Sequence, residues 1–184
     1  MTRPRLLGIA GALRAGSTNR KLVHEAARLF GPAEFTEADL RLPLYDGDLE
    51  ARGIPAEVTQ LADQIAAADA IVISTPEYNS ALPGVLKNAL DWVSRTGMPV
   101  WQDKPVAIVS AAAGRTGGAR AQSSLRLAVT PFRPRLLTGP EVMIANSGNA
   151  FDDQGRLIDE TSVEVLGALM TALRAETARL AVAA

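Results

Sequence analysis

The sequence contains no cysteine and only one histidine, His24. Without cysteine there are no disulfides, no thiolate nucleophiles and no zinc or iron–sulfur sites built on thiolates. Aromatic residues make up 4% of the chain, and 19 basic residues nearly balance 20 acidic ones, for a formal net charge of −1. A nucleic-acid binder normally carries a basic stripe, so this balance argues against nucleic acid as a partner. It also argues against the strongly acidic surface of an electron carrier.

Long hydrophobic runs are also missing. No apolar run approaches the roughly 18 residues of a transmembrane helix. The first residues, 1–5, lead directly into a short apolar run and lack the pattern of a signal peptide. We therefore expect a cytoplasmic protein with no membrane partner. A chain of 184 residues suits a single domain, 1–184, because a chain near this size buries roughly 70% of its surface on folding.

Short apolar runs alternate with helical patterns along the whole chain. This alternation predicts an α/β fold with a doubly wound, mostly parallel five-stranded sheet and helices on both faces. If the strand order is 2-1-3-4-5, the switch point lies between strands one and three, where such sheets bind ligands at their carboxyl edge. The expected strands are 6–10, 33–38, 70–74, 106–110 and 141–145. Of the expected helices, the first ends near residue 30, the second begins at Pro55, and the other three cover about 82–93, 119–128 and 160–181.

A polar loop, 11–19, follows the first strand and precedes a helix. A helix N-terminus presents free N–H groups to anions, and Arg14, Ser17 and Asn19 would add charge and side-chain donors. Neither G-x-x-x-x-G-K-[ST] nor G-x-G-x-x-G is present, which favours a terminal phosphomonoester over a pyrophosphate. A simpler interpretation is that Ser17 or Thr18 caps the helix while Arg14 is solvated, and both interpretations can hold together.

Two further loops follow the third and fourth strands. The first, Pro76-Glu77-Tyr78-Asn79, offers a ring and outward backbone N–H groups to a flat ligand. The second, 111–120, is rich in small residues that allow a ligand close to the backbone. Each could instead be an ordinary connection, and the second a flexible one. Together with the loop 11–19, they fit a mononucleotide with a phosphate at one end and a flat ring at the other.

Four motifs, in order along nearly the whole chain, resemble the NADPH-dependent FMN reductase family, the flavodoxin-like group that includes bacterial chromate and quinone reductases. The resemblance implies a flavodoxin-like fold, bound FMN, and a homodimer or homotetramer. The motifs are Gly11-x-Leu13-Arg14-x-x-Ser17-x-Asn19, Pro76-Glu77-Tyr78-Asn79, Leu86-Lys87-Asn88-Ala89-x-Asp91-Trp92 and Gly117-Gly118-x-Arg120.

The resemblance also implies which residues bind the cofactor. Those of the loop 11–19 should hold the FMN phosphate, those of 76–79 should line the isoalloxazine ring, and Ser110 with the loop 114–118 should approach from the other side. The family usually has serine where this chain has Ala12, which removes one donor worth about 1 kcal/mol. The expected cofactor-binding residues are Leu13, Arg14, Ser17, Asn19, Pro76, Glu77, Tyr78, Asn79, Ser110, Gly114, Gly117 and Gly118.

The implied function is an FMN-dependent oxidoreductase. Hydride would pass from NADPH or NADH through FMN to quinones, flavins, azo compounds or oxidised metal ions, with no catalytic side chain and no metal required. Arg115 is a candidate for attracting the phosphate of NADPH. Two alternatives remain: an FMN-binding carrier or regulatory flavoprotein without NAD(P)H activity, and a Rossmann-type NAD enzyme with Glu37 or Asp39 as the ribose ligand. The missing G-x-G-x-x-G counts against the last.

Overall fold

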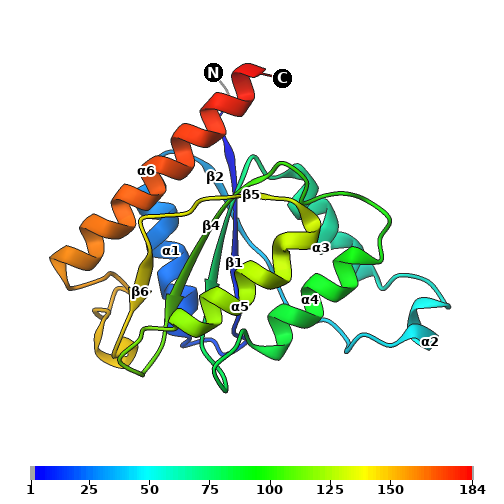
Figure 1. Ribbon diagram of the computed structural model, residues 1–184, viewed down its shortest axis with the longest axis horizontal. Coiled ribbons are helices and arrows are strands. Elements are labelled where there is room, and N and C mark those ends of the chain that lie inside the picture. Colours follow the sequence, from blue (N-terminus) through cyan, green and yellow to red (C-terminus); the bar gives the residue numbers. More distant parts are fainter. Residues whose placement is uncertain (1–2, 184) are drawn as a thin grey trace.

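The computed structural model describes residues 3–183 and contains a parallel sheet with helices on both faces (Figure 1). Its strand order is β2-β1-β3-β4-β5, and β6 also pairs with β4, so the predicted order 2-1-3-4-5 and the flavodoxin-like class are confirmed. The strands are β1 (Arg5–Ala10), β2 (Glu34–Glu37), β3 (Ala70–Thr75), β4 (Pro105–Ala111), β5 (Arg135–Leu136) and β6 (Val142–Ile144).

The helices form one layer on each face of the sheet. In Figure 1, α1 and α6 lie on one side, and α3, α4 and α5 lie on the other. No helix among residues 3–183 is long and apolar enough to cross a membrane. The helices are α1 (Thr18–Phe30), α2 (Gly47–Glu50), α3 (Ala56–Ala67), α4 (Gly84–Ser94), α5 (Ala119–Val129) and α6 (Glu160–Ala183), with short 3₁₀ turns at Thr130–Phe132 and Ser147–Asn149.

The central strands are buried on both faces, which explains their continuous apolar runs. In β3, Ile71 and Ile73 join the core under α3, α4 and α5, whereas Ala70 and Val72 join the core under α1 and α6. This alternation follows from the two-residue period of a strand. The two cores together anchor the carboxyl ends of β1, β3 and β4.

The prediction of a single fifth strand at 141–145 was incomplete. The start of β4 pairs with β5 (Pro105↔Arg135), and its end pairs with β6 (Val109↔Val142), so two short segments share that edge. Gly139 and Pro140 lie between these segments. Because proline has no N–H to donate to a ladder, it is confined to strand ends, edges and bulges, which fits an interruption of the pairing there.

The long connection between β2 and α3 is attached to α4 by two side chains of the Leu86–Trp92 motif. Asn88 Nδ2 and Trp92 Nε1 donate to the Pro43 carbonyl at 2.9 and 2.8 Å, and Asn88 Oδ1 accepts from Tyr45 N at 2.8 Å. Trp92 is fully buried, as expected for a packing residue. This connection also contains the short helix α2.

Candidate functional site

The three polar loops leave the sheet at the same edge. Ala10 pairs with Ser74, and Thr75 pairs with Ser110, so β1, β3 and β4 end side by side. The Gly11 N–H donates to the Ser74 carbonyl at 2.8 Å, which brings the first loop against the second. In Figure 1 these loops lie together along the lower edge of the sheet. The predicted convergence at the switch point is therefore present.

Asn19, in the first turn of α1, connects the carboxyl ends of β3 and β4. Its Nδ2 donates to the Ala111 carbonyl at 2.8 Å, and its Oδ1 accepts from Ser74 Oγ at 2.8 Å and from Ala111 N at 3.1 Å. The side chain is 2% exposed and lies within the fold. These contacts engage both polar atoms of the Asn19 side chain within the protein.

The loop from Ala12 to Gly16 has the features of an anion site. Among residues 3–183, none of its five N–H groups donates to a backbone acceptor. The first turn of α1 contains no acidic residue, so its positive dipole end is not neutralised by its own helix. Arg14 is exposed and forms no ion pair with a described residue. These donors can together accept a phosphate.

Ser17 caps α1, as the simpler interpretation of this loop expected. Its Oγ accepts from Asn19 N at 3.2 Å, and its N–H donates to the Arg14 carbonyl at 3.0 Å. Ser17 is 3% exposed, so its hydroxyl lies at the base of the loop and not on its rim. The cap fixes where the helix begins and hence where its free N–H groups point.

In the second loop, the carboxylate of Glu77 caps α5. Its Oε2 accepts from Arg120 N at 3.0 Å and from Ala121 N at 3.3 Å. Tyr78 is 57% exposed and Asn79, at φ 50°, is also exposed. The N–H groups of Glu77 and Asn79 donate to no backbone acceptor among residues 3–183. This loop therefore offers backbone donors and one ring to a ligand.

The third loop is closed at its base and open at its tip. Ser110 is fully buried, and its Oγ donates to the Gly117 carbonyl at 2.6 Å. A Cβ on Gly117 would lie 2.6 Å from the Met143 carbonyl carbon, and one on Gly118 would lie 2.7 Å from Ser110 Cβ. Both glycines have positive φ, so they are required for packing against the sheet. Gly114 faces open space.

Eleven of the twelve predicted residues thus fall into two groups. The exposed group can touch a ligand directly, whereas the buried group holds the loops in place. Side-chain direction is not visible in a motif, which is why the sequence treated both groups alike. The exposed residues are Leu13, Arg14, Tyr78, Asn79 and Gly114; the buried ones are Ser17, Asn19, Pro76, Ser110, Gly117 and Gly118; and Glu77 is intermediate.

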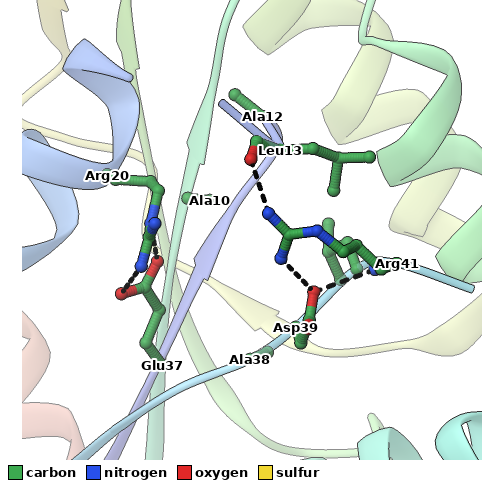
Figure 2. A pocket seen from close by; sticks show the side chains of 9 residues that line it. Ala10, Ala12, Leu13, Arg20, Glu37, Ala38, Asp39 and Arg41 are labelled. Atoms are coloured by element: carbon green, nitrogen blue, oxygen red, sulfur yellow. Dashed lines mark hydrogen bonds and ion pairs between the residues drawn. The ribbon is translucent and has the colours of Figure 1, made fainter. Parts of the chain in front are cut away.

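A cavity of about 180 Å³ lies between the loop 12–16 and the end of β2 (Figure 2). On one side Arg20 forms a two-point ion pair with Glu37, at 2.6 and 3.0 Å, and on the other side Asp39 binds Arg41. Glu37 and Asp39 were expected only as possible ribose ligands, and neither arginine was predicted here, because Arg20 meets Glu37 across 17 residues and Arg41 meets Leu13 across 28.

Glu37 makes a third side-chain contact, between its Oε2 and His24 Nε2, at 2.8 Å. Burial by itself would raise the pKa of the Glu37 carboxyl, but the hydrogen bonds from Arg20 and His24 outweigh it and hold the pKa below its usual value. A carboxylate engaged by two side chains is poorly placed to bind a ribose. This arrangement disfavours the Rossmann-type alternative.

Comparison with known proteins agrees with this geometry. The sequence model of the NADPH-dependent FMN reductase family matches residues 4–149. An NAD(P)H-dependent FMN reductase of Pseudomonas aeruginosa is 45% identical over 178 residues, which cover 96% of each chain. A quinone reductase of Escherichia coli K12 is 38% identical over 89% of this chain and 90% of its own.

A solved structure gives the same result. FerB, a flavoenzyme NAD(P)H:(acceptor) oxidoreductase from Paracoccus denitrificans, superimposes with a TM-score of 0.86 at 32% identity, over 96% of this chain and 98% of its own. The match extends beyond the motifs to the full arrangement of strands and helices. With its strand order, its three converging loops and these relatives, the chain belongs to the NADPH-dependent FMN reductase family.

Proposed function

We propose that this protein is an FMN-dependent oxidoreductase that takes hydride from NADPH or NADH and reduces quinones. The observation that carries the proposal is the loop 12–16, whose five N–H groups have no backbone acceptor and whose Arg14 has no ion-pair partner among the described residues. This loop follows Gly11, which contacts Ser74 and Pro76 just before the exposed Tyr78, at the switch point of the sheet. The relatives named above support the choice of donor and acceptor.

The first loop would hold the phosphate of FMN. Its N–H groups and the Arg14 guanidinium supply charge-assisted donors, and the N-terminus of α1 adds its positive dipole end. Ala12 has no hydroxyl to donate, so at this position only the backbone N–H can bind the phosphate. Ser17 and Asn19 hold these donors in place by hydrogen bonds within the protein.

The other two loops would hold the ring. FMN, when bound, supplies the chemistry of hydride acceptance and transfer. The N–H groups of Glu77 and Asn79 can donate to the polar edge of the ring, and donors there stabilise negative charge that develops on it. Tyr78 and the exposed tip, 113–116, flank the opening through which two substrates would enter in turn.

Several finer properties belong to the same proposal. We propose that free flavins, azo compounds and oxidised metal ions, chromate included, also serve as acceptors, because an open site used by two substrates selects them loosely. Arg115, exposed at the tip of the third loop, would attract the phosphate of NADPH. We further propose one domain, a homodimer or homotetramer, and a cytoplasmic location.

The visible absorption spectrum, recorded before and after anaerobic addition of NADPH, tests the proposal. We expect two flavin bands that bleach on addition of NADPH and recover when a quinone is added. Bands that bleach with dithionite but not with NADPH or NADH would instead favour an electron carrier. A colourless protein that takes up no added FMN would refute the proposal.

A further inference from the structure

Arg41 connects the segment after β2 to the phosphate loop. Its Nη2 donates to the Leu13 carbonyl at 2.8 Å, across 28 residues of sequence. Asp39 orients this side chain, because its Oδ1 accepts from Arg41 Nη1 and from Arg41 N, both at 3.0 Å. Figure 2 shows the guanidinium between the two acceptors, with the Leu13 carbonyl directed toward it.

This contact determines the direction of a neighbouring donor. A peptide unit is planar and trans, so its N–H points away from its C=O. The C=O of Leu13 and the N–H of Arg14 belong to the same unit. With the carbonyl held on the side of Arg41 and β2, the Arg14 N–H must point to the opposite side, toward the crevice beside β3.

The loop has few other internal contacts that could set this direction. Within Ala12 to Gly16, the Leu13 carbonyl accepts from Arg41 and the Arg14 carbonyl accepts from Ser17 N. None of the N–H groups of residues 12–16 donates a hydrogen bond to the backbone of a described residue. Without the Arg41 contact, the Leu13–Arg14 peptide would be free to rotate, and binding an anion would then have to order it.

We propose that Arg41, oriented by Asp39, is a positioning residue that presets the Arg14 N–H for the phosphate of the flavin. The inference rests on the proposed function, since it concerns the same loop. It assigns part of the affinity for FMN to a guanidinium that lies on the β2 side of the loop and need not touch the flavin. The flavin ring is held by the other two loops, so the effect should depend on the phosphate alone.

Binding of FMN and of riboflavin, which has no phosphate, separates these roles. We expect Arg41→Ala to weaken FMN binding about tenfold, equivalent to about 1.4 kcal/mol, and to leave riboflavin binding within about twofold of wild type. Arg41→Lys should recover part of the loss, because an ammonium can reach one acceptor but lacks the fork that spans two. Asp39→Asn should have a smaller effect of the same kind.

The matched control is Arg5→Ala at the amino end of β1, far along the strand from the loop 12–16, where Arg5 forms an exposed pair with Asp69 at 3.6 Å. It should change neither affinity. Since the side chains of Arg41 and Asp39 are 59% and 65% exposed, these variants should fold, and thermal unfolding checks this. Equal losses for FMN and riboflavin, or no loss for FMN, would overturn the role of Arg41.

The two proposals fail in distinguishable ways. If wild type binds FMN and bleaches with NADPH while Arg41→Ala binds FMN normally, only the positioning role is refuted. If wild type binds neither flavin, both proposals are refuted. A double-mutant cycle with Arg14→Ala should show coupling between the two sites, because both act on the same phosphate.

Discussion

Replacement of Asn19 by alanine should destabilise the protein even when no flavin is bound. The side chain makes three buried hydrogen bonds, two with Ala111 and one with Ser74 Oγ, at 2.8 to 3.1 Å. Each such bond contributes about 1 kcal/mol, and a buried group left without its partner costs a further amount of about that size. Ser74 is fully buried and Ala111 is 1% exposed, so water does not easily replace the lost partner. We expect a loss of about 3 to 5 kcal/mol in the free energy of unfolding.

Urea-induced unfolding of the flavin-free protein measures this loss. Trp92 and Trp101 are 0% and 4% exposed, so their fluorescence should report the exposure of the core. Asn149→Ala is the matched control: Asn149 is exposed, its amide lies 3.4 Å from Asn146, and its loss should cost no more than about 0.5 kcal/mol.

The outcome decides between two roles for Asn19. If it held the phosphate directly, as the motif implied, the flavin-free variant would unfold like wild type and only FMN binding would weaken. A loss below about 1 kcal/mol without flavin would therefore refute the reasoning from the three hydrogen bonds. A large loss without flavin would show that Asn19 stabilises the fold around the site through its hydrogen bonds to Ser74 and Ala111.

Two further predictions test the third loop and the β2 edge. Gly117→Ala should destabilise the protein by at least about 2 kcal/mol, because φ at this position is +58° and the new Cβ would lie 2.6 Å from Met143. The control is Gly114→Ala, where a Cβ would have no atom within 4 Å, so the unfolding free energy should change by less than about 0.5 kcal/mol. Equal effects in denaturant would contradict this. The pKa of Glu37 is lowered, so its pairing with Arg20 stabilises the fold above the unfolded pKa of about 4.3 and is lost as the pH falls through the lower folded pKa. The difference in unfolding free energy between wild type and Glu37→Gln should thus shrink in acid, and a difference independent of pH would refute the assignment.

The local pattern of the sequence was enough to predict the fold class and the order of the strands, although not the division of the last one into β5 and β6. Consecutive β-branched residues such as Ile71, Val72 and Ile73 predict a strand buried on both faces, and the structure places them in β3. The alternation of such runs with helical patterns predicts a parallel sheet, and parallel strands bring their following loops to one edge. The family motifs then indicated which loops we expect to bind the cofactor. These features depend on periodicity and chain order, which a sequence contains in full.

Only the tertiary structure decided what each polar side chain does. Glu77 caps a helix 43 residues away, and Arg41 holds a carbonyl 28 residues away, contacts that depend on how loops pack and not on local spacing. The sequence likewise could not show that Asn19 points into the fold while Arg14, in the same motif, points out. A motif records which residues are present, whereas hydrogen-bond partners across the sheet edge follow from the packing of the three loops against one another.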